Sequence, residues 1–452
     1  MGDKLEMKER RRCLIILCLL LGSISPSAGE TPESLVLLIV DGLGSYYIYP
    51  EFTPHTQSGK PLEKIAAPNL TEGDARVINL RVPVPRTGPA HSVIVTGDPE
   101  AESEMLSSTT TIYDILHDEG FIALAVMEKG DFSSMRREQD AILYAESNSI
   151  HEPLFKVEQH QHRSVPREII ETMEERSSLM PGYMEDARGA EAYRRYNRFA
   201  IETAEELVRV MRENHPDERF ILTINVGGVD SVGHHTNHTT YLKVIEGIDS
   251  DIKRLKDLCR EEKIAFILTG DHGMSFKRRE SHGGHAGNDY KELPESLHTP
   301  LILSAPNIEH GLISGEWEQE NIAPTILSIL DLPNLLSTDS RPLPIKRYAN
   351  LYVITDAENV KLYEDERLIS EAEGERIRFK NLSGRYTILA TSEKRRIEES
   401  VTVREDTTLT LKMPEEATGE RLERLERRHV AGILLILLIN ISGIILIRRV
   451  TR

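Results

Sequence analysis

The chain is 452 residues long, carries a formal net charge of −18 and is 39% hydrophobic and 28% charged. This composition is that of a globular protein and excludes a disordered or fibrous one. The negative charge argues against general nucleic-acid binding, because phosphate backbones attract Lys and Arg. Residues 1–30 carry +1 and residues 421–452 carry +5, so the body of the chain, residues 31–420, carries −24.

Both ends of the chain have the patterns of membrane signals. Near the N-terminus, three arginines precede the uncharged run 13–21 and a segment of small residues, which predicts a secretory signal over residues 1–28. Residues 430–447 are uncharged, long enough for a transmembrane helix and followed by a basic tail. Residues 420–429 predict a charged stalk. We therefore expect a single-pass cell-membrane protein with its acidic body on the extracytoplasmic side.

Residues 31–340 predict one catalytic domain in which apolar runs alternate with helical patterns. The apolar runs are residues 34–40, 122–127, 220–226, 264–269 and 300–304. The helical stretches are residues 109–117, 191–213, 240–262 and 321–332. Continuous apolar runs are typical of strands buried on both faces, and the alternation predicts an α/β fold: a mostly parallel sheet flanked by helices. Residues 150–190 are polar and form a candidate cap.

The pattern changes over residues 346–415, where short strands of alternating polarity follow one another. Residues 381–384 have the composition of a turn between two of these strands. This segment predicts a small β-sandwich. It contains no cluster of catalytic residue types, so we expect it to be a spacer or binding module between the enzyme and the membrane.

Asp and His residues gather just after the apolar runs of the predicted sheet, in glycine-rich strings. The candidate ligands are Asp41, Asp230, His234, Asp271, His272 and His285. Ligands bind beyond the carboxyl ends of parallel strands, and carboxylate and imidazole are usual ligands for catalytic metals. There are enough ligands for two divalent ions, which together can hold the attacking and leaving oxygens of a phosphoryl displacement. Zinc is the first expectation, with manganese or magnesium as alternatives.

Thr87 is the candidate nucleophile. It lies in a proline-rich segment that leads into a helical run, so its hydroxyl is expected near a helix N-terminus. Free amides and the positive end of the helix dipole favour an alkoxide or a phosphate there. A metal ion that contacts the Thr87 oxygen would lower the pKa of the hydroxyl further. The alternative for a threonine at this position is a plain helix N-cap.

These strings form an ordered set, LIVDGLG, RTGPAHSVIVTGDPE, GGVDSVGHH, LTGDHGMS and GGHAGND. The set resembles the alkaline phosphatase superfamily over residues 34–335, in particular its phosphatase and nucleotide pyrophosphatase/phosphodiesterase branch. The resemblance implies Thr87 as a covalent nucleophile and two metal sites. One site would use Asp41, Thr87, Asp271 and His272, and the other Asp230, His234 and His285. His282, also followed by glycine, is an alternative to His285.

The expected function is therefore two-metal hydrolysis of phosphate esters through a phosphorylated Thr87. The sulfatase branch is disfavoured, since residues 88–90 do not supply its C/S-x-P-x-R string. One alternative is a phosphodiesterase or phospho-head-group transferase that acts on lipid or envelope polymer. Another is a non-catalytic cell-surface protein that retains the fold.

Overall fold

The structure is a computed structural model and describes residues 29–128, 133–147, 149–160, 162–393 and 395–414. The chain divides into two compact units. Of the described residues, the first comprises those up to Leu351 together with Lys380–Ser383 and Val403–Thr408. The second comprises the described residues of Tyr352–Phe379 and Gly384–Thr402 and residues 409–414. The candidate ligands all lie in the first unit.

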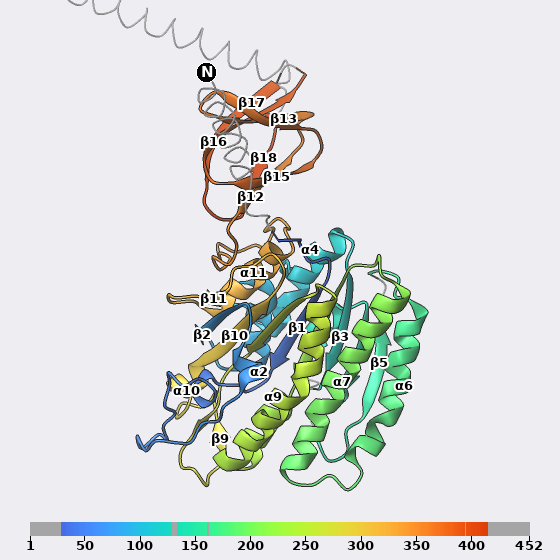
Figure 1. Ribbon diagram of the computed structural model, residues 1–452, viewed down its shortest axis with the longest axis vertical. Helices are drawn as coiled ribbons and strands as arrows, with labels where there is room; N and C mark the ends of the chain where they lie inside the picture. Colours follow the sequence, from blue (N-terminus) through green and yellow to red (C-terminus); the bar gives the residue numbers. More distant parts are fainter. Residues whose placement is uncertain (1–28, 129–132, 148, 161, 394, 415–452) are drawn as a thin grey trace, which may run out of the picture. The chain divides into compact units, whose positions relative to one another are not determined.

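A nine-stranded mixed sheet forms the centre of the first unit, in the order β11-β2-β10-β7-β1-β6-β3-β4-β5 (Figure 1). The strands are β1 (Leu35–Val40), β2 (Ala75–Arg81), β3 (Ile122–Met127), β4 (Ala141–Ala145), β5 (Phe155–Gln159), β6 (Phe220–Val226), β7 (Ala265–Gly270), β10 (His298–Ser304) and β11 (Gly311–Leu312). The strands β3, β6, β1 and β7 run parallel to one another and are buried throughout. The expected α/β sheet flanked by helices is thus present.

Helices cover both faces of this sheet (Figure 1). They are α2 (Pro68–Thr71), α3 (Thr87–Thr96), α4 (Ile112–Asp118), α5 (Ser133–Arg137), α6 (Arg167–Met184), α7 (Ala190–Asn214), α8 (Gly228–His235), α9 (His238–Glu261), α10 (Pro294–Leu297) and α11 (Ile322–Ile329), with 3-10 turns η1 (Ser45–Tyr47), η2 (Ser103–Ser108) and η3 (Gln319–Asn321). The alternate residues of β1 enter different core clusters. Val36 and Leu38 join the cluster with α7 and α9, whereas Leu35 and Leu37 join the cluster with α3, α4 and α11. This two-sided burial explains the uninterrupted apolar run.

Two strands of the main sheet, β10 and the edge strand β5, run antiparallel to the neighbours with which they pair. β10 pairs antiparallel with both β7 and β2. The connection from β7 to β10 holds no long crossover helix, only the hairpin of β8 (Ser275–Phe276) with β9 (Gly283–Gly284) and the short α10. A strand parallel to β7 would need a crossover of a dozen or more residues that carries the chain back to the edge where β7 begins. The connection after β7 instead stays at the edge where β7 ends. β10 must therefore run back.

Residues 150–190 do not form a separate cap. β5 pairs antiparallel with β4 and is the edge strand of the main sheet. The following helix, α6, buries Ile169, Ile170, Met173 and Met180, which join the same core cluster as α7 and α9. The segment is polar because an edge strand with one exposed face carries polar residues at alternate positions.

The β-strands of residues 349–411 form two small sheets, β15-β12-β18 and β14-β13-β16-β17. Their members are β12 (Ala349–Thr355), β13 (Asn359–Glu364), β14 (Arg367–Ala372), β15 (Arg376–Leu382), β16 (Gly384–Ser392), β17 (Arg395–Val403) and β18 (Thr407–Leu411). The expected turn between β15 and β16 contains two residues with positive φ, Asn381 and Gly384. Two strands, β13 and β14, were not expected from the sequence, and packing of the sheets as a sandwich stays a prediction.

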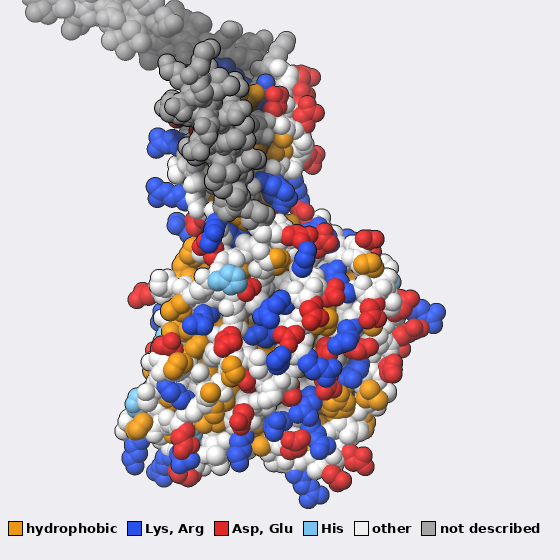
Figure 2. Space-filling model, in the orientation of Figure 1, with side chains coloured by type: hydrophobic (Ala, Val, Ile, Leu, Met, Phe, Trp, Pro, Cys, Tyr) orange, Lys and Arg blue, Asp and Glu red, His pale blue; other side chains and the backbone are white. Residues whose placement is uncertain are grey.

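The expected secretory signal (1–28), stalk (420–429) and transmembrane segment (430–447) lie outside the described residues. Among the residues that the structure describes, no helix is long and apolar enough to cross a bilayer. On the face of the first unit in Figure 2, acidic and basic side chains are intermixed, with no large area of one sign.

His238 provides a test of the packing beside α9. Its side chain is fully buried against the rings of Tyr47 and Phe276, and this burial lowers the pKa of His238 from 6.5 to about 4. The unfolded state therefore binds more protons between these two values, and stability falls as the pH falls from about 6.5 to 4. We expect His238→Phe to remove this loss, which amounts to at most about 3 kcal/mol.

Urea unfolding of both proteins at pH 7.5, 5.5 and 4.5 measures the effect. His151→Phe, at an exposed histidine, serves as the control and should retain the wild-type acid dependence. An unchanged pH dependence in His238→Phe would show that His238 does not titrate on unfolding in this range.

Candidate metal centre

The carboxyl ends of the parallel strands meet at one edge of the main sheet. Asp41 follows β1, Glu128 follows β3, Gly227 follows β6 and Asp271 follows β7. The strands thus bring together groups that are far apart in the sequence, as expected for a ligand site in an α/β sheet. Asp41, Glu128 and Asp271 are fully buried.

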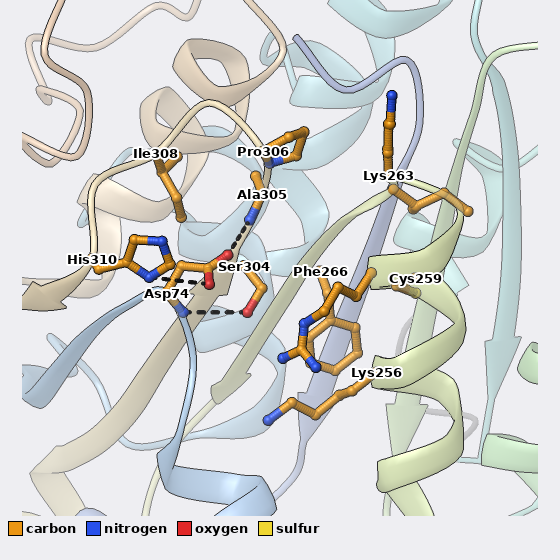
Figure 3. Close-up of a pocket in the computed structure, with 12 residues that line it drawn as sticks. Asp74, Lys256, Cys259, Lys263, Phe266, Ser304, Ala305, Pro306, Ile308 and His310 are labelled. Carbon is orange, nitrogen blue, oxygen red and sulfur yellow. Dashed lines mark hydrogen bonds and ion pairs between the residues drawn. The ribbon is translucent and has the colours of Figure 1, made fainter. Parts of the chain in front are cut away.

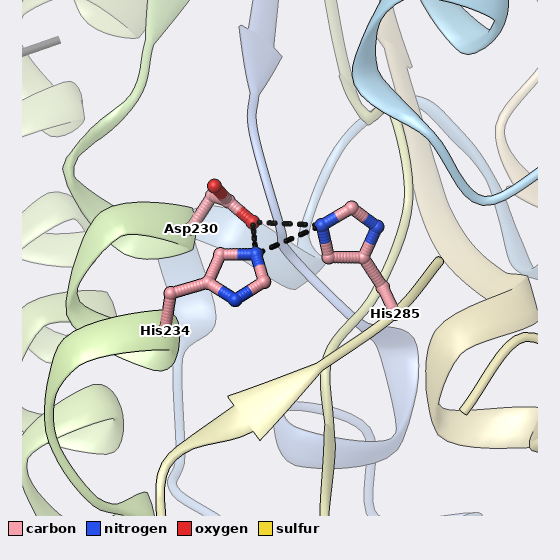
Figure 4. Close-up of side chains that lie close together, drawn as sticks. All are labelled: Asp230, His234 and His285. Atoms are coloured by element: carbon pink, nitrogen blue, oxygen red, sulfur yellow. Dashed lines mark hydrogen bonds and ion pairs between the residues drawn. The ribbon is translucent and has the colours of Figure 1, made fainter. Parts of the chain in front are cut away.

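Three of the predicted ligands converge on one point, as Figure 4 shows. Asp230 and His234 are four residues apart on α8 and therefore share a face of this helix, while His285 follows β9. His234 Nε2 and His285 Nε2 are 3.0 Å apart, and they lie 3.2 and 3.3 Å from Asp230 Oδ1. The three ligand atoms are close enough for one metal ion to contact all of them.

The tautomer of His285 fits metal binding. Its Nδ1 lies 2.6 Å from the carbonyl oxygen of Pro85, so Nδ1 carries the proton and donates it there. The lone pair of Nε2 then faces His234 and Asp230. In metal-bound histidines, the ring nitrogen that does not bind the metal usually donates its proton to a carbonyl or carboxylate oxygen. The donors present therefore suit a divalent cation such as zinc.

Thr87 and His272 lie beside this cluster. Thr87 is the first residue of α3 and is half-buried, and its Oγ1 is 3.2 Å from His272 Nε2. His272 Nδ1 donates to the carbonyl oxygen of Gly273 at 3.0 Å, which again leaves the Nε2 lone pair facing inward. The same Nε2 lies 3.5 Å from Asp41 Oδ1 and 3.4 Å from Asp271 Oδ2. These four residues were expected to form one metal site, and the structure places them together.

Asp271 is oriented by the backbone around it. Its Oδ1 accepts hydrogen bonds from the amides of Gly42 (3.0 Å) and His272 (2.7 Å), which leaves Oδ2 on the side of the cluster. Gly42 has φ +82°, and a Cβ atom there would lie 2.8 Å from the Cα atom of Asp230. Glycine is required after Asp41 because of both the positive φ and this close approach.

The two expected groups adjoin each other. The rings of His272 and His285 are stacked with centroids 3.6 Å apart. Ligand atoms of Asp41, Asp230 and His272 also lie within 4.8 Å of one another, so Asp230 reaches both groups. The geometry therefore offers adjacent positions for two cations. It places three carboxylates in the protein interior, where uncompensated like charges are costly.

His285, and not His282, contacts the cluster. His285 is buried, whereas His282 is exposed and its Nδ1 contacts the carbonyl oxygen of Gly283. The pairing of β8 with β9 directs the next residue toward Asp230. Gly284 lies against the ring of Tyr290, where a Cβ atom would come within 2.8 Å. His285 thus stays the predicted ligand on geometric grounds.

His91 and Asn225 belong to the site and were not predicted. His91 is buried one helical turn after Thr87, and its Nδ1 lies 2.8 Å from the carbonyl oxygen of Thr87 and 3.5 Å from Asp271 Oδ2. Asn225 Nδ2 is 3.2 Å from His91 Nε2 and can donate to it. The spacing of four residues from Thr87 was the available signal, because it places His91 on the same face of α3.

Glu128 was also missed. It follows an apolar strand just as Asp41 does, so the same sequence pattern could have identified it. Its Oε2 accepts a hydrogen bond from the amide of Gly227 at 2.8 Å. Burial, opposed by this hydrogen bond and reinforced by the charge of Asp41, raises the pKa of Glu128 well above its usual range.

A separate cavity of about 330 Å³ lies at the opposite edge of the sheet, where β7 begins and β10 ends (Figure 3). The Lys256 ammonium in its wall already donates to the backbone carbonyl oxygens of Asn69 and Glu72. The Asp74 carboxylate, also in its wall, accepts from the amide of Ala305 and pairs with His310. The six residues of β7, about 20 Å of extended chain, separate this cavity from Asp271.

Comparison with known proteins identifies one related segment. A model of the metalloenzyme superfamily matches residues 184–310. A 2,3-bisphosphoglycerate-independent phosphoglycerate mutase of Mycoplasma genitalium is 31% identical over 116 residues, which cover 24% of this chain and 20% of the mutase. The corresponding mutase 2 of Methanosarcina barkeri is 25% identical over 152 residues, which cover 32% of this chain and 26% of that protein.

The chain thus spans about a fifth to a quarter of the length of the curated relatives that it matches. Among solved structures, the alkaline phosphatase PafA aligns with a TM-score of 0.48 and 12% identity over 70% of this chain and 99% of that one. A putative sulfatase from Bacteroides fragilis aligns with a TM-score of 0.44 and 12% identity over 84% and 91% of the two chains.

The segment 184–310 contains five of the seven predicted site residues. They are Asp230, His234, Asp271, His272 and His285. Asp41 and Thr87 precede the matched segment, and the fold brings them to the same edge of the sheet. The part of the chain that supplies most of the candidate metal ligands is therefore similar in sequence to the metalloenzyme superfamily.

Proposed function

We propose that this protein is a two-metal hydrolase of phosphate esters that uses Thr87 as a covalent nucleophile. The observation that carries the proposal is the convergence of Asp230, His234 and His285 on one point, beside a Thr87 hydroxyl that contacts His272. Similarity to phosphoglycerate mutases supports phosphate rather than sulfate esters as substrates. Without bound cations, the buried carboxylates would repel a phosphate group.

In the proposed reaction, the Thr87 hydroxyl loses its proton to solvent and its oxygen attacks phosphorus. The bond from phosphorus to the ester oxygen breaks, the alcohol leaves with a proton taken from solvent, and a phosphorylated Thr87 results. Water then hydrolyses this phosphoester, which releases inorganic phosphate and restores the hydroxyl. Two divalent ions would supply positive charge that stabilises the attacking and leaving oxygens. His272 Nε2 lies 3.2 Å from the Thr87 oxygen and is itself close to Asp41 and Asp271. The amides at the start of α3 would donate hydrogen bonds to a bound phosphate.

We further propose that this enzyme acts on the extracytoplasmic side of a cell membrane. The proposal rests on sequence patterns alone: the secretory signal over residues 1–28 and the apolar run over residues 430–447. An accessible phosphate-ester substrate would then be an extracellular or membrane-surface molecule. Protease digestion of intact cells that express the full chain tests the orientation, because an extracytoplasmic body is cleaved without permeabilisation.

Removal of metal is expected to abolish activity. The full chain in detergent, dialysed against a chelator, should lose turnover of 4-nitrophenyl phosphate by about 100-fold or more, because the ions are expected to supply the charge that stabilises the attacking and leaving oxygens. Addition of Zn²⁺ or Mn²⁺ should restore turnover. Full activity at a metal content below one ion in ten chains would contradict the proposal. A preference for bis(4-nitrophenyl) phosphate would identify the protein as a phosphodiesterase.

A further inference from the structure

Two side chains hold the start of α8, the helix that carries two of the three ligands in Figure 4. Glu128 follows β3 and Asn197 lies on α7, and both are completely buried. Glu128 Oε2 accepts a hydrogen bond from the amide of Gly227 at 2.8 Å. Asn197 Oδ1 accepts one from the amide of Gly228 at 2.9 Å. Successive amides at the start of α8 are thus bound by side chains of two other elements.

These hydrogen bonds determine where α8 begins. The first amides of a helix have no partner within the helix, and burial of an unpaired amide is costly. Glu128 and Asn197 therefore favour one position of the first turn over its alternatives. Because α8 has only eight residues, a shift of that turn moves Asp230 and His234 together relative to His285.

The surrounding contacts leave little room for adjustment. A Cβ atom on Gly228 would lie 2.3 Å from Asn197 Oδ1, so only glycine permits this approach. Glu128 is held through its own backbone as well. Its amide donates to the carbonyl oxygen of Asn225 at 3.1 Å, and its carbonyl oxygen accepts from the Tyr196 hydroxyl. The acceptor groups are therefore attached to a rigid part of the fold.

We propose that Glu128 and Asn197 are positioning residues for the metal ion expected at Asp230, His234 and His285. They act through the start of α8, and neither is offered as a ligand of that ion. This inference rests on the proposed metal centre, and it is independent of which ester is hydrolysed. Loss of such an outer contact typically lowers metal affinity by about 10- to 100-fold.

Calorimetric titration of Zn²⁺ into the metal-free full chain tests the inference. The wild type is expected to bind two ions. Glu128→Leu removes the acceptor oxygen and keeps a side chain of similar volume. It should lower the affinity for one of the two ions by about 10- to 100-fold and change the affinity for the other ion little. Glu128→Gln keeps an acceptor oxygen and should retain nearly the wild-type affinity for both ions.

The control is Glu205→Leu. Glu205 is a buried carboxylate on α7 and pairs with Arg209 and Arg254. This substitution should leave both affinities unchanged. If Glu128→Leu does not fold, Asn197→Leu is the deciding variant and should show the same selective loss of one ion. Wild-type affinities in the folded leucine variant, or an equal loss in Glu128→Gln, would overturn the inference. A wild-type chain that binds no ion would overturn the proposed function as well.

Discussion

Replacement of Thr87 by alanine is expected to lower kcat for 4-nitrophenyl phosphate by about 10⁴-fold or more, because the variant has no oxygen at the attacking position. Thr87 is half-buried, and its Oγ1 lies 3.2 Å from His272 Nε2, which places this hydroxyl beside the candidate metal ligands where a substrate phosphate would bind. The metal content should stay near two ions per chain, since the carboxylate and imidazole ligands remain. Steady-state kinetics and metal analysis of the purified variant measure both quantities.

Thr87→Ser is the matched control for this experiment. It keeps the hydroxyl at the first position of α3 and should retain most of the turnover. A phosphorylated form should be trapped in the wild type and in Thr87→Ser by rapid acid quench with ³²P-labelled substrate, and it should be absent from Thr87→Ala. Full activity of the alanine variant would exclude Thr87 as the nucleophile.

The second large effect is expected at His285. His285→Ala should weaken the binding of one metal ion by more than about 100-fold, because loss of a direct ligand exceeds the 10- to 100-fold effect of an outer contact. His285 Nε2 lies 3.0 Å from His234 Nε2 and 3.3 Å from Asp230 Oδ1, and these three residues form one candidate metal-binding group. Turnover should fall in parallel with occupancy of this ion.

His282→Ala provides a close comparison, since it removes the same type of side chain three residues earlier. His282 is exposed, and its Nδ1 lies 3.3 Å from the carbonyl oxygen of Gly283, so its loss should change metal affinity by less than about twofold. The two variants together test the choice between these histidines. A larger effect at His282 than at His285 would show that the loop after β9 adopts another arrangement when metal is bound.

Much of the site could be predicted because strand ends are visible in the sequence. Asp41 and Asp271 each follow an uninterrupted apolar run, and a charge directly after such a run must lie where the strand leaves the core. Glu128 follows β3 in the same way, yet it was missed because it lies in no glycine-rich string. Asn197 could not have been found, since it lies in the middle of the amphipathic α7 among core residues.

Pairing across the fold explains the other differences. The direction of β10 depends on the path of the connection from β7, which contains no periodic pattern. The edge position of β5 depends on its pairing with β4, and a short polar strand carries little signal of its own. Which strands pair depends on packing between segments that are far apart in the sequence. The pattern of residues within one short segment does not determine that packing.

By itself, the sequence determined the α/β class, the parallel central strands and seven of the residues that reach the carboxyl edge, because each depends on local polarity along one segment. The tertiary structure alone decided which histidine turns inward, how Asp230 is shared between two ligand groups, and which side chains hold α8. Those features depend on contacts such as that between Glu128 and Gly227, 99 residues apart, whose geometry exists only once the sheet has formed.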